Sequence, residues 1–238
     1  MTVPKIAPAE DLAEDDADAP IRTVHGLSVP RSSFLSPRRA RRVEAGTYEG
    51  REVEGALALV REGDRVLELG AGLGIVGGTV ALARRPERHV AFEANPRLIE
   101  KVRALNEMNG LDRSEIRFGV LDADPERPDT RTFYLPRSYL GSSLTRTTAT
   151  DRVEAPTHGW QEVVDELRPD VLLCDIEGGE AELLGRVDLS GFRAVVIEFH
   201  PEAYGVAGMR ACKRALREAG LAPVKELSVR TVWAAERA

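Results

Sequence analysis

Short apolar segments alternate with longer helical segments from about residue 52 to the end of the chain. Short apolar runs are typical of buried strands, and their alternation with helices is typical of βα units around a mostly parallel sheet. Near the C-terminus, APVKEL and VRTVWAA lie close together, as expected of two strands that pair antiparallel. The pattern therefore predicts an α/β fold with a mostly parallel seven-stranded sheet, helices on both faces and an antiparallel C-terminal strand pair. The strands predicted before that pair are 65–70, 89–94, 115–121, 170–176 and 193–199.

Helices are predicted in the segments between these strands. The segment 75–85, IVGGTVALARR, is rich in small residues that allow close packing on the sheet. The next helix is expected to begin at Pro96, because proline is preferred in the first turn, and to end near Gly110. Further helices are predicted over about 203–219 and within 38–62.

Three parts of the chain differ in composition. Residues 1–20 are acidic and are predicted to form a disordered tail, and residues 21–62 are predicted to form an N-terminal helical cap. Residues 63–238 are predicted to form the βα domain. Within it, residues 122–158 are rich in proline, threonine, arginine and serine, which predicts a lid-like insertion, because loops of this length are usually functional or mobile.

Charge and cysteine content exclude several classes of protein. The formal net charge is −6, and residues 1–20 account for −5 of it, so the rest of the chain lacks the basic surface expected of a nucleic-acid binder. Cys174 and Cys212 are too few for a disulfide framework and lack the paired spacing of a zinc site. Because no stretch resembles a signal peptide or a membrane span, we expect a cytoplasmic protein without a membrane partner.

The segment LELGAGLGIVG places glycines where the first predicted strand turns into its helix. Gly70, Gly72 and Gly74 permit positive φ and let a ligand approach the free N–H groups of the helix. Glu93 ends the next strand, where a carboxylate accepts the ribose hydroxyls of an adenosine. These positions together predict a cofactor that carries a nucleoside.

Two cofactors fit this pattern. Residues 72–77 match G-x-G-x-x-G, and Glu93 lies near the spacing of a dinucleotide site, which is consistent with an NAD(P)-dependent oxidoreductase. However, Glu68 precedes the glycines directly, and a carboxylate there suits a ligand with an ammonium and a sulfonium group. We therefore favour S-adenosylmethionine. A Rossmann module that binds a partner without catalysis is the remaining alternative.

The segment DIEGGE crowds the carboxylates of Asp175, Glu177 and Glu180 directly after the apolar run 171–174. Buried carboxylates that repel one another are costly, so a cationic partner is expected nearby. A simpler interpretation is that Glu180 begins a helix, where acids suit the helix dipole, and that the glycines form its entry turn.

With this segment included, the chain resembles the FkbM family of methyltransferases. The family hallmark is a fourth strand that runs into D-[IV]-E-G-x-E, and the other matches lie between about residues 46 and 201. They are GTYE at 46–49, FEANP at 92–96, NEMNGL at 106–111, SSL at 142–144 and VVIEFHP at 195–201.

The resemblance implies a Rossmann-like class I methyltransferase that moves a methyl group from S-adenosylmethionine to an oxygen, commonly a hydroxyl of a sugar, a glycan or a secondary metabolite. The glycine turn departs from many relatives, which have G-A-N-x-G, because Leu73 takes the place of the asparagine.

A hydroxyl is a poor nucleophile until its proton leaves, so a base or a metal is expected at the carboxyl ends of strands four and five. Asp175 or His200 is predicted to accept this proton, and Glu177 to hold the network around them. A structural role for His200, before Pro201, is the alternative. Asp175, Glu198 and His200 also suit a divalent cation, but the metal-free version is favoured because these ligands are inferred from strand ends and not from a tight spacing.

The remaining predicted contacts involve the cofactor and the acceptor. Asp122 is expected at the adenine edge, although aspartate is also common in turns. Tyr48 and Glu49 are expected at the methionine end of the cofactor, and Ser142, Ser143 and Glu198 at the acceptor. The predicted cofactor-binding residues are Glu68, Gly70, Ala71, Gly72, Glu93, Ala94, Asp122, Tyr48 and Glu49.

Overall fold

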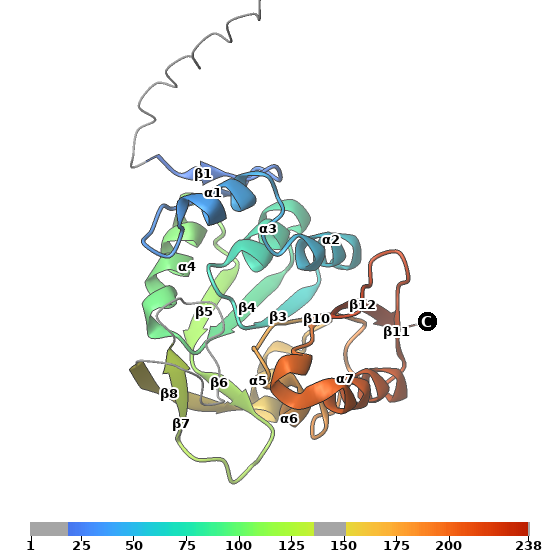
Figure 1. The fold of residues 1–238 in the computed structure, drawn as a ribbon. Coiled ribbons are helices and arrows are strands. Elements are labelled where there is room, and N and C mark those ends of the chain that lie inside the picture. The colour runs from blue at the N-terminus through green and yellow to red at the C-terminus, as the bar shows by residue number, and fades with distance from the viewer. Residues whose placement is uncertain (1–18, 136–150, 238) are drawn as a thin grey trace, which may run out of the picture.

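The computed structural model describes residues 19–135 and 151–237. Its main sheet has seven strands in the spatial order β11-β12-β10-β9-β3-β4-β5. Figure 1 shows β5, β4 and β3 on one side of this sheet and β10, β12 and β11 on the other. The five strands β5, β4, β3, β9 and β10 are parallel to their neighbours, whereas β12 pairs antiparallel with both β10 and β11. The predicted α/β fold, its seven-stranded sheet and its antiparallel C-terminal pair are therefore confirmed. The strands are β3 (Arg65–Leu69), β4 (Arg88–Glu93), β5 (Ser114–Phe118), β9 (Val171–Cys174), β10 (Ala194–Glu198), β11 (Leu221–Pro223) and β12 (Val232–Arg237).

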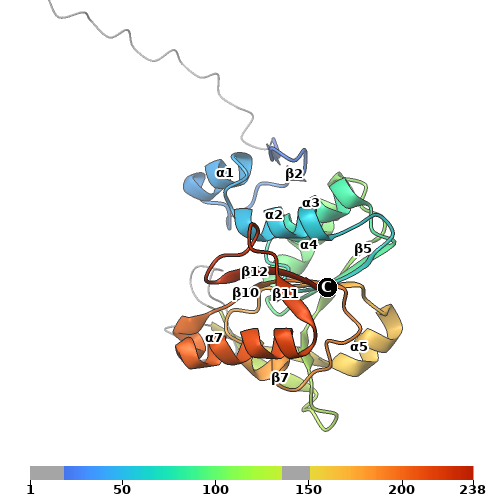
Figure 2. The ribbon, with the colours of Figure 1, turned by 90° about the vertical axis from the view of Figure 1, so that its right-hand side faces the viewer.

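Helices cover both faces of this sheet (Figure 2). One face carries α1 to α4 and the other carries α5 to α7. The helices are α1 (Pro37–Glu44), α2 (Gly50–Leu59), α3 (Ile75–Arg84), α4 (Pro96–Met108), α5 (Trp160–Leu167), α6 (Glu180–Leu184) and α7 (Pro201–Glu218). In the described part of the chain, none of them has the length and hydropathy needed to cross a membrane.

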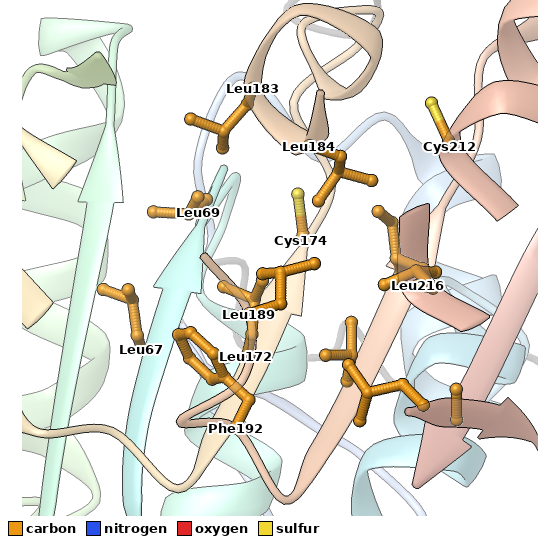
Figure 3. Packing of buried hydrophobic residues seen from close by; sticks show 14 of the residues in the cluster. Leu67, Leu69, Leu172, Cys174, Leu183, Leu184, Leu189, Phe192, Cys212 and Leu216 are labelled. Carbon is orange, nitrogen blue, oxygen red and sulfur yellow. The ribbon is translucent and has the colours of Figure 1, made fainter. Parts of the chain in front are cut away.

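The strands alternate their side chains between two apolar layers. On β3, Leu67 and Leu69 pack toward α5, α6 and α7, whereas Val66 packs toward α2 and α3. The layer around Leu67 and Leu69 is drawn in Figure 3, where Cys174 on β9 and Cys212 on α7 lie among leucine side chains. Successive residues of a strand point to opposite faces, so a sheet that is covered on both sides requires apolar residues at both sets of positions.

The predicted third strand, 115–121, is two strands in the structure. β5 ends at Phe118, and β6 (Val120–Asp122) pairs with β8 (Asp151–Gly159), which also pairs with β7 (Thr130–Leu135) in a separate sheet. Gly119 lies between them at φ 138°, and a Cβ there would lie 2.5 Å from the carbonyl oxygen of Pro156. The close contact with β8 therefore requires glycine and breaks the strand.

The predicted helical region 38–62 contains two helices, α1 and α2. The turn between them places Gly46 at φ 66° and Glu49 at φ 49°. Upstream, β1 (Ile21–Arg22) and β2 (Ser28–Val29) form a small antiparallel pair whose apolar residues pack with those of α1, α3 and α4. The turn between α1 and α2 approaches the carboxyl ends of the central strands, where a cavity lies.

Candidate active site

A cavity of about 710 Å³ lies at the carboxyl ends of the parallel strands. The loops that follow β3, β4 and β9 and the last residue of β10 contribute to it, together with the turn between α1 and α2 and with β6 and β7. Among the described residues that line it, nine carry carboxylates and four carry guanidinium groups, which gives the cavity an acidic interior. The acidic lining residues are Glu49, Glu52, Glu54, Glu93, Asp122, Asp175, Glu177, Glu182 and Glu198.

The glycine turn after β3 forms one wall of the cavity. Gly70 has φ 82°, and a Cβ on it would lie 1.7 Å from the carbonyl oxygen of Asp175. Gly72 has φ 55°, and the nearest atom to a Cβ there is Glu49 Oε1, 4.0 Å away. Gly70 is therefore required by contact with the end of β9, whereas Gly72 leaves open space toward the cavity.

Glu93 at the end of β4 is 7% exposed and lines the cavity. Its Oε2 accepts a hydrogen bond from the Gly72 N–H at 2.8 Å, and its Oε1 accepts one from the Asn95 N–H at 2.7 Å. Burial raises the pKa of this carboxyl to about 7, although these backbone hydrogen bonds act in the opposite direction. Each oxygen can still accept a hydroxyl, which suits the role predicted for Glu93 at a ribose.

Asp122 at the end of β6 is 5% exposed and also lines the cavity. Its Oδ2 accepts a hydrogen bond from Arg131 Nε at 2.8 Å, and its Oδ1 accepts one from the Asp124 N–H at 2.9 Å. Arg131 on β7 also reaches Glu182 on α6, with 3.0 Å between Nη2 and Oε1. A guanidinium group thus joins the insertion to α6 at this end of the cavity.

Tyr48 and Glu49 lie in the turn between α1 and α2, and both line the cavity. The Tyr48 ring is buried, and the Arg42 guanidinium lies over it at 5.6 Å from the ring centre. Burial raises the pKa of Glu49 to about 8, with further increases from the nearby charges of Glu52 and Glu198. The turn therefore adds a carboxyl with an unusually high pKa to the acidic interior.

Glu180 explains the DIEGGE segment. Its side chain is fully buried, and its Oε1 accepts hydrogen bonds from the backbone N–H groups of Ile176 at 3.3 Å and Gly178 at 3.2 Å. The same oxygen lies 2.9 Å from Nδ1 of His200. Glu180 therefore fixes the turn that contains Glu177, which has φ 52°, and orients the histidine at the end of the neighbouring strand.

His200 lies behind the carboxylates and is 7% exposed. Its Nε2 is 3.3 Å from Glu177 Oε2 and 3.6 Å from Asp175 Oδ1. Burial lowers the pKa of His200, but the hydrogen bond to Glu180 and the charges of Glu180, Asp175 and Glu177 outweigh it and raise the pKa to about 9. His200 therefore keeps its proton at neutral pH in the absence of another cation.

Asp175 and Glu198 complete the acidic floor of the cavity. Burial raises the pKa of Asp175 well above its ordinary value, and the charge of Glu198 adds to this effect. The pKa of Glu198 is raised to about 7, mainly by burial and then by the charge of Glu52. Such groups accept a cationic ligand readily, because a positive charge nearby favours their ionised forms.

Two predicted cofactor contacts do not line the cavity. Glu68 is 4% exposed, and its carboxylate accepts the Gly77 N–H at 3.0 Å and contacts His89 Nε2 at 3.0 Å, so it supports α3 on the face of the sheet opposite to α5, α6 and α7. Ala71 packs against apolar residues of β4, α4 and β5. Ala94 does line the cavity. Ser142 and Ser143 lie outside the described residues.

A family model described as the methyltransferase FkbM domain matches residues 68–220, which is more than half of the chain. The chain belongs to the FkbM methyltransferase family. The chain is therefore an S-adenosylmethionine-dependent methyltransferase, and the family membership rules out the oxidoreductase and binding-module alternatives. No curated protein matches the chain.

Solved structures with a similar fold include other methyltransferases. A precorrin-6y C5,15-methyltransferase from Geobacter metallireducens is 15% identical, with a TM-score of 0.50 over 92% of this chain and 100% of that chain. A ribosomal protein L11 methylase from Lactobacillus delbrueckii subsp. bulgaricus is 11% identical, with a TM-score of 0.48 over 82% of this chain and 80% of that chain. At such low identity the likeness concerns the fold alone, and the first structure supports the Rossmann-like class I assignment.

The cavity of this methyltransferase fits S-adenosylmethionine. Gly72 leaves space beside the backbone, and Glu93 offers two carboxylate oxygens to ribose hydroxyls. Acidic groups such as Glu49 suit the ammonium and sulfonium charges of this cofactor. When bound, the cofactor supplies an electrophilic methyl group on its sulfonium.

Several lining residues were not predicted from the sequence. Arg131 comes from the insertion, and Glu52 and Glu182 come from the exposed-looking starts of helices. Glu180, which lies behind the cavity, begins α6, as one of the two interpretations of the motif predicts, but its contact with His200 was not predicted. The D-[IV]-E-G-x-E pattern is the sequence signal that marks Glu180, which is the last acid of the pattern and is fully buried in the structure.

Proposed function

We propose that this methyltransferase methylates a hydroxyl oxygen of a small molecule, such as a sugar, a glycan end or a secondary metabolite. The observation that carries this proposal is the position of Asp175. Its backbone carbonyl is packed against Gly70 of the cofactor turn, and its side chain lines the same cavity. A carboxylate beside the methyl donor is where a hydroxyl acceptor needs a base.

Asp175 is the group that we assign as this base. Its raised pKa makes it a stronger proton acceptor than an ordinary aspartate once it is ionised. The protonated His200 behind it and a cationic cofactor in the cavity both favour the ionised form. In this proposal Asp175 Oδ2 would take the hydroxyl proton, and the hydroxyl oxygen would bond to the methyl carbon while the bond from that carbon to the sulfonium sulfur breaks, which would leave S-adenosylhomocysteine.

His200 and Glu177 are assigned as positioning residues. His200 does not line the cavity, and its pKa of about 9 keeps it protonated at neutral pH, so it is poorly placed to act as the base. Its Nε2 lies between the carboxylates of Asp175 and Glu177. We propose that Glu177 and Glu198, which do line the cavity, contact the acceptor.

The size of the cavity supports a small acceptor. Its volume of about 710 Å³ lies within the range of about 300–1,000 Å³ that is usual for small-molecule sites. The nine carboxylates that line it in the described part of the chain would repel a phosphate backbone, which argues against RNA or DNA as the acceptor.

The acceptor atom can be identified with S-adenosylmethionine that carries carbon-13 in its methyl group. The full chain would be incubated with a panel of sugars, amino sugars, phenols, amines and short RNAs, and the products examined by carbon-13 NMR. We expect label in O-methyl products of hydroxyl-bearing small molecules. Label found exclusively in N-methyl, C-methyl or RNA products would overturn the proposal.

The role of Asp175 can be tested separately with Asp175→Asn. Loss of a general base typically lowers the rate by about 10²–10⁴-fold. We expect this loss in turnover, while the affinity for S-adenosylhomocysteine, measured by calorimetry, stays within about threefold, since Asn keeps the shape of the side chain. The matched control is Asp165→Asn on the exposed side of α5, which should change neither quantity. Equal loss of affinity and turnover in Asp175→Asn would make Asp175 a cofactor ligand instead.

A further inference from the structure

Three potential metal ligands meet at the floor of the cavity. Asp175 follows β9, Glu198 ends β10 and His200 follows β10 two residues later, so two neighbouring parallel strands bring them together. One ligand atom from each lies within 4.8 Å of the other two. We propose that Asp175, Glu198 and His200 form a binding site for a divalent cation of the Mn²⁺ or Mg²⁺ class.

The orientation of His200 supports this site. Its Nδ1 lies 2.9 Å from Oε1 of the fully buried Glu180, and because a carboxylate oxygen accepts, Nδ1 must carry the hydrogen. The other ring nitrogen, Nε2, therefore faces Asp175 and Glu177, and a metal ion bound there would replace the proton that Nε2 carries in the cation-free site. Histidines that bind metals usually donate their second ring N–H to a carboxylate in this way, which fixes the ring and its tautomer.

Asp175 provides an independent observation. Its Oδ1 is sealed from solvent and has no hydrogen-bond partner within the described residues, although it points toward His200 Nε2 at 3.6 Å. A buried carboxylate oxygen without a donor is costly, and a cation beside it would remove that cost. Glu180 Oε2 is likewise buried without a donor, but Glu180 does not line the cavity, whereas Asp175 does, so Asp175 is the residue of the two that a cation in the cavity can reach.

The donor set indicates the class of metal. Two carboxylate oxygens suit hard cations such as Mg²⁺ and Mn²⁺, and the imidazole nitrogen favours Mn²⁺ over Mg²⁺. The nearby cysteine, Cys174, is buried in the apolar layer between β9 and α7, and it is not among the three ligands. Asp175 and Glu198 line the cavity, so one side of the cluster is open to it. Water or an acceptor oxygen could complete the coordination of the cation from that side.

The role of the cation rests on the proposed function, whereas its binding does not. With Asp175 Oδ1 on the metal, Oδ2 stays available to take the proton of the acceptor hydroxyl. A cation that also contacts that hydroxyl would ease the loss of its proton. The site would thus place acceptor, base and cation on one side of the cofactor turn.

The test is a titration of the full chain with MnCl₂ alone, in which electron paramagnetic resonance measures free Mn²⁺. We expect one equivalent to bind, and Asp175→Asn, Glu198→Gln and His200→Gln each to weaken binding by at least about 10-fold. The controls Asp165→Asn, Glu218→Gln and His25→Gln change exposed residues of the same types and should bind Mn²⁺ as the wild type does. Circular dichroism would verify that each variant is folded.

Two results would overturn the cation site. The first is that the wild type binds less than one equivalent of Mn²⁺. The second is that the folded variants Asp175→Asn and His200→Gln bind Mn²⁺ as tightly as the wild type does. Failure of the cation site must be distinguished from failure of the proposed function. A parallel titration with S-adenosylhomocysteine in EDTA and the carbon-13 assay make this distinction. If the cofactor product binds and O-methyl label appears while Mn²⁺ does not bind, the cation site fails alone.

Discussion

Two buried glutamate–histidine pairs lie on opposite sides of the central sheet. Glu68 and His89 are each 4% exposed, with 3.0 Å between Oε2 and Nε2. In the second pair, Glu180 is fully buried and His200 is 7% exposed, and the distance between Glu180 Oε1 and His200 Nδ1 is 2.9 Å. In both pairs the glutamate also accepts backbone N–H groups at or near the start of a helix.

The pairs differ at the second ring nitrogen of the histidine. Nδ1 of His89 contacts the Ser114 hydroxyl at 3.2 Å, so that pair is closed by neutral partners within the fold. Nε2 of His200 faces the carboxylates of Asp175 and Glu177, both of which line the cavity. Burial of the pair and a short glutamate–histidine distance therefore do not distinguish a structural pair from a functional one. The distinguishing feature is the partner of the second ring nitrogen of the histidine.

The largest effect is expected from Glu180→Gln. Glutamine can still accept the hydrogen bonds of the turn, but the charge that holds His200 is lost. We expect turnover to fall by about 10- to 100-fold, as is typical when the partner of an active-site histidine is changed, and the pH profile of turnover to shift. Turnover and a pH profile that both match the wild type would show that the pair does not serve the site.

Glu68→Gln is the matched substitution in the other pair. We expect it to lower the free energy of unfolding by about 1–3 kcal/mol, because the buried His89 and Gly77 N–H lose a charged partner. Affinity for S-adenosylhomocysteine should stay within about threefold, since Glu68 does not line the cavity. Chemical denaturation and calorimetry measure the two quantities. A loss of affinity above about tenfold would restore Glu68 to the cofactor-binding residues.

A smaller effect is expected from pH, through Glu93. Its pKa is raised from 4.5 to about 7, so the folded chain holds a proton that the unfolded chain has released between these values. The free energy of unfolding should therefore decrease as pH rises through this window, by on the order of 1 kcal/mol from this group. Urea denaturation of Glu93→Gln should give a flatter dependence on pH than the wild type. An unchanged slope would mean that Glu93 titrates normally.

The smallest effect is expected from Arg131→Gln. This substitution removes the charged link between Asp122 and Glu182 but leaves the lining carboxylates in place. We expect the affinity for S-adenosylhomocysteine to fall by about three- to tenfold, because Asp122 loses the partner that orients it. Arg103→Gln, on the exposed face of α4, is the control. Equal affinities in both variants would exclude a role for Arg131 in cofactor binding.

The order of elements was predictable because apolar runs and helix caps are local features. Pro96 begins α4, as expected from the preference of proline for the first turn. The break at Gly119 was not predictable, because apolar residues continue on both sides of the glycine in EIRFGVL, and the contact that requires glycine comes from Pro156 and His158, which are distant in sequence. The strand β8 was also missed, because Pro156 is atypical within a strand.

The candidate site was predictable where residues end parallel strands. Glu93, Asp175 and Glu198 all lie at such ends, and these ends meet at one edge of the sheet. Glu68 lies within β3 between Leu67 and Leu69, so its side chain points to the face of the sheet opposite to the two leucines. This alternation is visible in the sequence and could have predicted that Glu68 does not line the cavity. The contact of Arg131 depends on the path of the insertion, which the sequence pattern does not specify.

The contrast between the two pairs can be tested in one experiment on the intact chain. The ring-nitrogen NMR signals of the four histidines would be recorded before and after addition of S-adenosylhomocysteine, with His200→Gln and His89→Gln used to assign them. We predict that the His200 signals move and the His89 signals do not, since His200 contacts carboxylates of the cavity and His89 is closed off within the fold. Signals of His89 that move while those of His200 stay fixed would contradict the division between a structural and a functional pair.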